Sequence, residues 1–318
     1  MEACKTVVTD ETSRTIIARN DSPDISFDRS INPYRGCEHG CIYCYARPTH
    51  AYLGHSPGLD FETRLYAKTN AAELLERELA APGYAAQTIA LGAVTDPYQP
   101  IERRYEITRA LLKVLSRTNH PVGLVTKSGL VTRDIDILAP MAERGLVKVA
   151  VSITTLDPKL ARAMEPRAAT PAKRIETIRK LAAAGIPAVV MVAPIIPGLN
   201  DPEIEAILEA AKDAGAVQAG YVTLRLPLEL KTLFRAWLAE HVPERADRIL
   251  ALLRQMHGGK DYVATFGHRQ TGSGPYAAMI GARFKLAVKR LGLSDRRVPL
   301  RTDLFRAPVL QGGQYALL

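Results

Sequence analysis

The segment "VKVAVSITTLDPKLARAMEPRAATPAKRIETIRKLAAAGIPAVVMVAPI", residues 147–195, contains one complete strand–helix–strand pattern. Two apolar, β-branched runs flank an amphipathic stretch, over residues 147–154, 188–195 and 170–185 respectively. Thr170 and Pro171 are typical of a helix N-cap and first turn, and Gly185 is suited to the left-handed residue that ends a helix. The segment therefore predicts a right-handed βαβ unit with two parallel strands.

The same alternation continues on both sides of this segment. Further strand patterns cover residues 24–31, 88–94, 122–127 and 219–226. Further helical patterns cover residues 70–80, 101–117, 131–145 and 201–215, with Asp201 and Pro202 as a second N-cap pair and Gly145 and Gly215 as further helix ends. Such a series predicts an α/β fold with a parallel sheet and outer helices, either a partial (β/α)6 barrel or a doubly wound sheet.

The alternation stops near residue 230, which divides the chain into three predicted parts. Residues 1–24 form an N-terminal segment, residues 25–230 the barrel core, and residues 231–318 a C-terminal accessory region. The accessory region begins with an amphipathic helix pair over residues 232–256 and becomes strongly basic further on. We expect it to be a helical, basic extension packed on the core.

Composition predicts an ordinary soluble protein. Hydrophobic residues make up 47% and charged residues 24% of the chain. The N-terminus lacks the apolar run of a signal peptide, and the longest apolar stretch is interrupted by Pro187, Pro194 and Pro197, so we expect no membrane segment. Four unevenly spaced cysteines favour a reducing cytoplasm. The net charge of +9 favours polyanionic partners such as nucleic acid.

Three of the four cysteines lie within "YRGCEHGCIYCYA", residues 34–46. A tetrahedral zinc site would need Cys37, Cys41 and Cys44 together with His39, His50 or His55, but the second spaced ligand pair of most structural zinc sites is missing. A redox dithiol would leave Cys37 without a role. Closely spaced thiolates on one loop fit a [4Fe-4S] cluster better.

Three thiolates leave one iron of such a cluster without a side-chain ligand from the loop. An open coordination position is typical of a catalytic metal centre, whereas electron-transfer clusters normally have four cysteines. The loop follows the first predicted strand, and active sites of barrel proteins lie in the loops after the strands. The cysteine loop therefore predicts catalysis.

The Cys-x3-Cys-x2-Cys spacing, with Tyr43 directly before the last cysteine, resembles the radical S-adenosylmethionine (SAM) superfamily over about residues 25–230. The resemblance implies a partial (β/α)6 TIM-like barrel, in which Cys37, Cys41 and Cys44 bind a [4Fe-4S] cluster. It implies that SAM binds the open iron and is cleaved by one electron to methionine and a 5′-deoxyadenosyl radical, which abstracts a hydrogen atom from the substrate. An electron donor such as flavodoxin or ferredoxin would be a partner.

The resemblance also assigns candidate SAM-binding residues to the predicted strand ends. Tyr43 would lie near the adenine, and Lys127 would pair with the SAM carboxylate. Ser152 and Thr154 share one face of the fourth strand, which points either inward, toward the ribose, or outward against a helix. The superfamily often has a Gly-Gly-Glu-like stretch that receives the methionine amine, where this chain has "LGAVTDPY". Gly92, Thr95 and Asp96 at the second strand are candidates by position alone. The stretch "APIIPGLND" resembles the fifth-strand segment that borders the adenine, which makes Ala193 and Pro194 candidates.

Within the superfamily, the stretches "VTDPYQPIE", "TKS" and "VSITTLD…EPR" look most like the DNA-repair photolyase branch related to spore photoproduct lyase. Photoproduct lyases use an extra cysteine near the end of the second strand as hydrogen donor. Here that stretch has no cysteine, and Cys4 lies far away in sequence. Thymine-dimer repair by that route is therefore not expected, and Tyr98 is a candidate substitute donor.

Two features of the C-terminal region predict contacts with anions. Arg283 and Arg290 lie two helical turns apart, as in a stripe that contacts phosphates, and the glycine-rich "GHRQTGSGPY" could bring backbone N–H groups to an anion. Further basic residues nearby are Lys285, Lys289, Arg296, Arg297 and Arg301. The alternative to an enzyme is a nucleic-acid-binding module with a structural Cys3His metal site and no catalysis.

Overall fold

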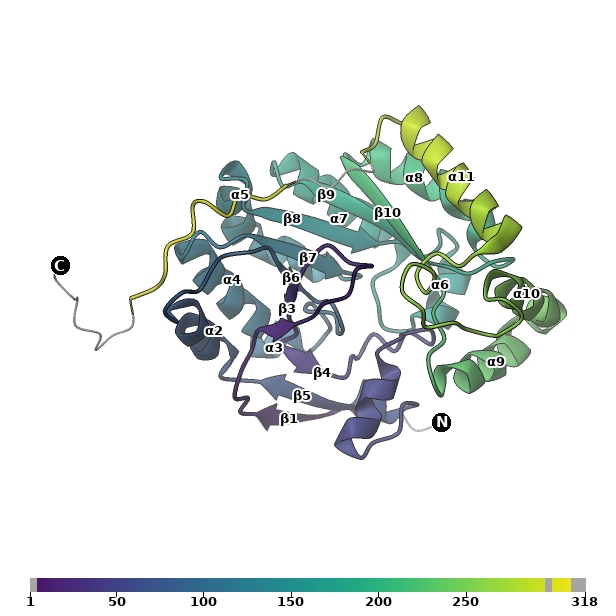
Figure 1. The fold of residues 1–318 in the computed structure, drawn as a ribbon, viewed down its shortest axis with the longest axis horizontal. Coiled ribbons are helices and arrows are strands. Elements are labelled where there is room, and N and C mark those ends of the chain that lie inside the picture. Colours follow the sequence, from purple (N-terminus) through teal and green to yellow (C-terminus); the bar gives the residue numbers. More distant parts are fainter. Residues whose placement is uncertain (1–4, 295–298, 310–318) are drawn as a thin grey trace.

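The main sheet is a partial barrel with one antiparallel edge strand. The computed structural model describes residues 5–294 and 299–309. The sheet has the strand order β10-β9-β8-β7-β6-β3-β2, and all neighbours except β2 and β3 are parallel. Its strands are β2 (Ala18–Arg19), β3 (Arg29–Ile31), β6 (Ile89–Leu91), β7 (Val122–Thr126), β8 (Val147–Ser152), β9 (Ala188–Ile195) and β10 (Gln218–Thr223). The six parallel strands follow one another in sequence order, as in a barrel, whereas a doubly wound sheet reverses its order. The α/β barrel prediction is confirmed (Figure 1).

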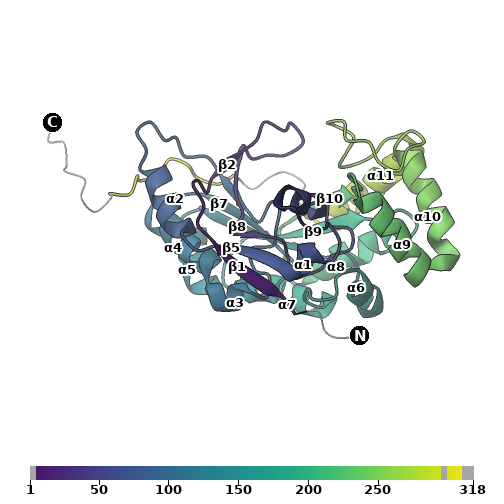
Figure 2. The same ribbon diagram turned by 90° about the horizontal axis from the view of Figure 1, so that it is seen from below.

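The connecting helices cover one face of this sheet. They are α2 (Ala71–Leu79), α3 (Glu102–Tyr105), α4 (Ile107–Arg117), η2 (Gly129–Asp134), α5 (Ile135–Glu143), α6 (Pro158–Met164), α7 (Pro171–Ala183), η3 (Asp201–Glu203) and α8 (Ile204–Asp213). Figure 2 shows α4, α5 and α7 together on one side of the sheet. The loops that follow the parallel strands lie at the carboxyl edge of the sheet.

Two helix predictions need correction. The predicted helix over residues 101–117 is split into α3 and α4, because Glu106 adopts a left-handed conformation with φ 49° between them. Asp201 is not the N-cap of α8, since its carboxylate accepts a hydrogen bond from the Gly198 N–H at 2.6 Å. By contrast, the Thr170 side chain caps α7 as predicted.

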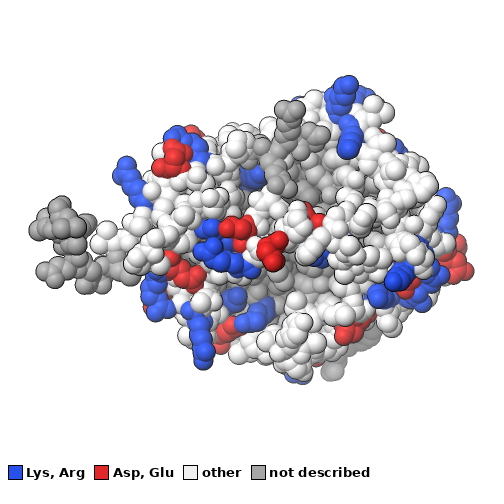
Figure 3. All heavy atoms as spheres, viewed as in Figure 1, with Lys and Arg blue, Asp and Glu red and all other residues white. Residues whose placement is uncertain are grey.

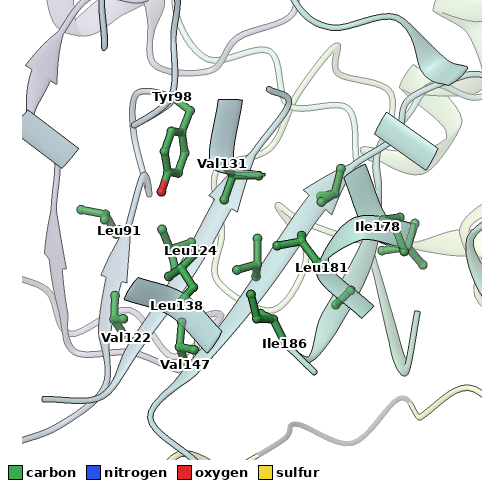
Figure 4. Close-up of a cluster of buried hydrophobic side chains, with 14 of the residues drawn as sticks. Leu91, Tyr98, Val122, Leu124, Val131, Leu138, Val147, Ile178, Leu181 and Ile186 are labelled. Carbon is green, nitrogen blue, oxygen red and sulfur yellow. The ribbon is translucent and has the colours of Figure 1, made fainter. Parts of the chain in front are cut away.

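The two faces of the sheet carry different side chains. Val122, Leu124 and Val149 belong to the main hydrophobic core, and Figure 4 shows Leu124 among core residues from neighbouring strands. The alternate positions lie outside this core; they include the small residues Ser30, Ala90, Gly123, Ala150, Ser152 and Gly220 and the larger residues Lys148, Val189 and Met191. On the same face, the Val125 side chain is 38% exposed. The inner face of the partial barrel therefore combines small and larger side chains; Ser30, Ala90, Ala150 and Ser152 are buried there, and Val125 is partly exposed.

A second, three-stranded sheet supports the cysteine loop and was not predicted from sequence. Its order is β1-β5-β4, with β1 (Val7–Glu11) parallel and β4 (Tyr34–Arg35) antiparallel to β5 (Arg64–Lys68). Between β4 and β5 lie η1 (Arg47–Leu53) and α1 (Asp60–Thr63). Since β4 ends one residue before Gly36, this sheet fixes where the cysteine loop begins.

The C-terminal helices correct the prediction of a phosphate-contacting stripe. The helices are α9 (Leu230–His241), α10 (Pro243–Met256) and α11 (Gly274–Arg290). Arg283 binds Glu205 through two hydrogen bonds, and Arg290 forms an ion pair with Glu209, so both arginines attach α11 to α8. Arg301 pairs with Asp303, while Arg296 and Arg297 lie outside the described residues. Within the described ranges, no helix is long and apolar enough to cross a membrane.

The glycine-rich loop in the C-terminal region binds a carboxylate of the same chain, that of Asp24. The Gly267 N–H donates to the Asp24 carboxylate at 2.7 Å, and the Arg269 guanidinium also binds Asp24. Hydrogen bonds from these two donors outweigh the effect of desolvation and lower the pKa of Asp24. The predicted anion-binding backbone therefore joins the C-terminal loop to the N-terminal segment.

Candidate active site

The three cysteines of the motif lie on one loop between β4 and η1. All three are free thiols; Cys37 and Cys41 are buried, and Cys44 is partly exposed. The Cys37 N–H donates to the Phe61 carbonyl at 2.9 Å, and the Cys44 N–H donates to the Cys41 carbonyl at 3.2 Å. Backbone hydrogen bonds thus hold the loop in place without using a thiol.

Two glycines give the cysteine loop its shape. Gly36 has φ +74°, and a Cβ there would lie 2.7 Å from the Phe61 carbonyl oxygen and 2.6 Å from Leu65. Gly40 has φ +68° and would place a Cβ against Glu62 and Arg167. Both positions favour glycine for backbone conformation, and Gly36 also for space, because its nearest neighbours include a backbone carbonyl. Only a narrow set of sequences can therefore present the cysteines in this way.

Arg47 is a supporting residue that the sequence reading missed. Its guanidinium is 2% exposed, and it donates hydrogen bonds to the carbonyls of Cys41 at 2.9 Å, Gly40 at 3.0 Å and Gly58 at 2.7 Å. An ion pair with Glu62 at 3.2 Å balances its charge. Arg47 therefore fixes the backbone carbonyls of Gly40 and Cys41 in the loop. The three cysteine side chains form no disulfides.

The chemistry of the three thiols fits a soft metal centre. Burial raises the pKa of Cys37 and raises that of Cys41 to about 12, whereas the positive charge of Lys127 acts in the opposite direction on Cys41. Buried thiols with raised pKa values are poor nucleophiles, but iron binding would replace their protons. Three such thiols on one glycine-shaped loop fit the ligand set of a [4Fe-4S] cluster.

The histidines of the zinc alternative have other partners. His39 Nδ1 lies 3.3 Å from the Asp96 carboxylate, His50 Nε2 lies 2.8 Å from the Arg64 carbonyl, and His55 Nε2 lies 2.7 Å from the Tyr66 hydroxyl. Across residues 5–294 and 299–309, no three His, Cys, Asp or Glu side chains are grouped to hold a single metal ion. This geometry counts against a Cys3His site.

Asp96 links the loop after β6 to the cysteine loop and to the end of β7. Its carboxylate accepts hydrogen bonds from the Lys127 N–H and the Thr126 hydroxyl, both at 2.7 Å, and it lies beside His39. Desolvation would raise the pKa of Asp96, but His39 and these hydrogen bonds outweigh it and lower the pKa to about 2. Asp96 is therefore an ionised residue that positions neighbouring loops.

Tyr43 and Thr154 meet at a buried carboxylate. The Tyr43 hydroxyl donates to Glu165 and lies 3.1 Å from the Thr154 hydroxyl, which itself donates to Glu165 at 2.7 Å. Glu165 also pairs with Arg174. The sequence stretch "EPR" contains Glu165, but nothing in its spacing predicted this contact. Glu165 therefore ties the cysteine loop to the segment after β8.

Several predicted SAM-binding residues lie around this contact. Lys127 Nζ lies 5.7 Å from the centroid of the Tyr43 ring, and the Thr154 hydroxyl lies 3.2 Å from the Ala193 carbonyl. Pro194 follows Ala193 through a cis peptide bond, and Ser152 is the last residue of β8. The structure thus brings the cysteine loop together with the carboxyl ends of β7, β8 and β9.

The remaining predicted site residues make hydrogen bonds that support neighbouring segments of the fold. The Thr95 hydroxyl donates to the Tyr34 carbonyl at 2.9 Å, and the Gly92 N–H donates to the Ile31 carbonyl at 3.1 Å. Tyr98 is 0% exposed within the hydrophobic core, where its hydroxyl donates to Asp134 at 3.1 Å (Figure 4). Because a hydrogen donor must reach the substrate, this position argues against the assignment of Tyr98 as the donor.

A separate cleft of about 690 Å³ lies between the cysteine loop, the segment after β7 and the start of α7. His39, Ser128, Arg133, Arg167 and Lys173 are among its lining residues. The lining includes none of the residues that meet at Glu165, so this cleft is distinct from the candidate SAM site.

The sequence matches the family model described as the radical SAM superfamily over residues 31–211. It is also similar to an uncharacterized protein of Mycobacterium tuberculosis, with 39% identity over 233 residues that cover 73% of this chain and 68% of the relative. An uncharacterized protein of Methanocaldococcus jannaschii is 28% identical over 214 residues, covering 67% of this chain and 76% of the relative.

Among solved structures, the fold is similar to spore photoproduct lyase complexed with dinucleoside spore photoproduct. The TM-score is 0.63 at 18% identity, and the match covers 90% of this chain and 80% of that chain. A mutant of that lyase with bound AdoMet and dinucleoside spore photoproduct matches with a TM-score of 0.54 at 18% identity, covering 79% of this chain and 80% of that chain. At this identity the likeness shows the shared fold.

Proposed function

The chain belongs to the radical SAM superfamily, and we propose that Cys37, Cys41 and Cys44 hold a [4Fe-4S] cluster at which SAM is cleaved reductively. When bound, such a cluster supplies the single electron that this superfamily uses for SAM cleavage. The observation that carries the proposal is a glycine-shaped loop with three free thiols at the carboxyl edge of a partial barrel. These thiols leave one coordination position for SAM.

The residues near the loop support a role in holding SAM. Lys127 provides a positive charge beside Cys41 and Tyr43, where it would bind the SAM carboxylate. Tyr43 is 6% exposed, and its ring would border the adenine with its edge, while its hydroxyl is fixed by Glu165. Ser152, Ala193 and Pro194 lie at the ends of neighbouring strands. In this arrangement the protein would orient SAM, and the substrate would approach from the inner face of the sheet.

We further propose that the substrate from which a hydrogen atom is abstracted is a nucleic acid. The net charge of +9 favours a polyanion, and the fold is shared with a lyase that was solved in complex with a dinucleoside. A cytoplasmic location and an electron donor such as flavodoxin or ferredoxin belong to the same proposal.

The test is formation of 5′-deoxyadenosine by anaerobically reconstituted protein with SAM and dithionite. We expect product that depends on the reductant. We expect each of Cys37→Ala, Cys41→Ala and Cys44→Ala to lose product together with iron, acid-labile sulfide and visible absorption.

Cys4→Ala is the matched control, because Cys4 is the one cysteine outside the motif. It should keep both the cluster and the product. A full cluster in the Cys41→Ala variant would contradict the ligand assignment. Wild-type protein with a full cluster but no 5′-deoxyadenosine, with or without oligonucleotide, would contradict the proposed catalysis.

A further inference from the structure

Two arginine–aromatic pairs lie beside the cysteine loop, outside the contacts assigned to SAM. The Arg225 guanidinium carbon lies 4.4 Å from the centroid of the Tyr45 ring, and the Arg269 guanidinium carbon lies 4.5 Å from that of Phe266. Tyr45 directly follows Cys44, and Arg225 follows β10 by two residues. We propose that these pairs form a stacking site for unpaired nucleobases of single-stranded nucleic acid.

Tyr45 is held so that its ring is available to a ligand. Its hydroxyl donates to the Ala93 carbonyl, while the side chain as a whole remains 38% exposed. Arg225 stacks on Tyr45, and the hydrogen bonds from Thr223 to the Gln270 carbonyl hold the loop of Arg269 beside the same strand end. A base stacked on Tyr45 would lie one residue from a cluster ligand.

Among the described residues Arg225 forms no ion pair, although its charge helps to lower the pKa of the Asp24 carboxyl. Apart from its stacking on Tyr45, Arg225 donates a hydrogen bond of 3.4 Å to the Tyr262 hydroxyl. Most other arginines near the site are paired; Arg47, Arg167 and Arg174, for example, bind carboxylates. A guanidinium that is half-buried, has no ion pair and lies next to an aromatic ring can stack on a nucleobase and bind the phosphate attached to it.

Phe266 extends the same surface along the C-terminal loop. Its side chain is 52% exposed. The loop is fixed at both sides, because Asp24 binds Gly267 and Arg269, and the Gln270 carbonyl accepts hydrogen bonds from the Thr223 N–H at 2.8 Å and hydroxyl at 2.9 Å. An exposed aromatic ring on an anchored loop loses little freedom when a ligand binds, which favours stacking.

The surface fits a single strand better than a duplex. Figure 3 shows Lys and Arg side chains spread over the visible face and interleaved with Asp and Glu, without a continuous basic patch. Duplex binding relies mainly on many phosphate contacts, whereas single strands bind through base–aromatic stacking with fewer charges. Bases inside a duplex have no free face for Tyr45 or Phe266. This inference rests on the proposed nucleic-acid substrate and names the form and the contacts of that substrate.

The experiment measures binding of the reconstituted holoenzyme to a fluorescein-labelled oligothymidylate by fluorescence anisotropy. Tyr45→Leu and Phe266→Leu should each weaken binding at least about fivefold, because each base loses a stacking partner. Arg225→Gln should weaken binding and reduce its salt dependence. An abasic strand of the same length and the matching duplex should both bind more weakly than the single strand.

Two matched controls are available on the same molecule. Tyr52→Leu removes a tyrosine that is 89% exposed, and Arg104→Gln breaks a comparable arginine–aromatic pair with Tyr105 at 4.7 Å. Both should bind like the wild type. Equal affinity for the abasic strand, tighter binding of the duplex, no binding of the single strand, or unchanged affinity in all three site variants would overturn the inference. Formation of 5′-deoxyadenosine without oligonucleotide would leave the proposed function standing in each case.

Discussion

The carboxylate of Glu165 and the guanidinium of Arg174 form an ion pair in which the two side chains are 0% and 2% exposed. Arg174 also donates to the carbonyls of Ser152 at 3.0 Å and Ala169 at 2.8 Å. The pair therefore connects α7 to the end of β8. Through the Tyr43 hydroxyl it also reaches the cysteine loop.

Replacing Glu165 by Gln should destabilise the protein strongly. The change leaves the Arg174 charge buried without a carboxylate, and breaking a buried pair from one side costs about 3–5 kcal/mol. Urea denaturation of the apoprotein measures the free energy of unfolding. Glu176→Gln is the control, since Glu176 pairs with Lys173 and Lys180 on an exposed helix face and should lose less than about 1 kcal/mol. Similar losses in both variants would contradict the role of the buried pair.

A second prediction separates backbone strain from lack of space at Gly36. Gly36 and Gly54 have nearly the same φ, +74° and +72°, but a Cβ on Gly54 meets no atom within 4 Å. Gly54→Ala should therefore cost about 1 kcal/mol from the left-handed backbone alone. Gly36→Ala should cost about 1–3 kcal/mol more, because the new methyl group meets the Phe61 carbonyl.

The measurement is thermal unfolding of both variants, followed by iron content after reconstitution. Gly36→Ala should also bind less iron, since the clash displaces the start of the cysteine loop. Equal unfolding temperatures for the two variants would show that space at Gly36 does not limit the loop.

The barrel strands and the cluster cysteines could be predicted from sequence because each has a local signature. A buried parallel strand such as residues 188–195 is an apolar run of fixed length, and the observed β9 has the same bounds. Cys37, Cys41 and Cys44 lie within eight residues, so their spacing is visible without knowledge of the fold.

The contacts that support the site could not be predicted, because they join residues far apart in the chain. Glu165 meets Tyr43 across 122 residues, and Asp24 binds Arg269 across 245. Arg283 looked like a phosphate contact because its acidic partner, Glu205, lies on another helix. The strands β1 and β5 were missed since their residues are partly exposed and lack a long apolar run.

Stability should fall in mild acid through His120. Burial lowers the pKa of His120 to about 4, so the neutral ring persists in the folded protein, with the Tyr84 hydroxyl 2.9 Å from Nε2 and the Pro121 carbonyl 3.0 Å from Nδ1. In the unfolded chain His120 takes up a proton near pH 6.5, whereas in the folded protein it stays neutral down to about pH 4. The free energy of unfolding should therefore fall between pH 6.5 and 4, by up to about 3 kcal/mol from this residue.

Comparing wild type with His120→Gln in urea at several pH values isolates this contribution, because the other histidines are present in both proteins. The amide of Gln retains a donor and an acceptor but does not titrate in this range. The dependence on pH should be shallower in the variant. Parallel curves for the two proteins would contradict a lowered pKa of His120.

The connection between the N-terminal and C-terminal segments can be tested through Asp24. Asp24→Asn removes the negative charge that pairs with Arg269 and accepts the hydrogen bond from the Gly267 N–H. The loop should then open more often, so trypsin should cleave after Arg269 several times faster. Asp303→Asn, which affects an exposed pair with Arg301, should leave that rate unchanged. Mass spectrometry of the fragments identifies the site, and an unchanged rate in Asp24→Asn would show that the loop is held mainly by Thr223.

The division between the two faces of the sheet bears on how such a chain can acquire a new substrate. Core packing depends on residues such as Leu124 and Val149, whereas Gly123, Ala150 and Gly220 lie on the opposite face. A Cβ on Gly123 would come no closer than 3.8 Å to Lys148, its neighbour on that face, so enlarging this position changes the shape of the space above the sheet without reaching the core residues beneath it. Selection can therefore act on substrate choice and on folding through separate sets of residues on the same strands.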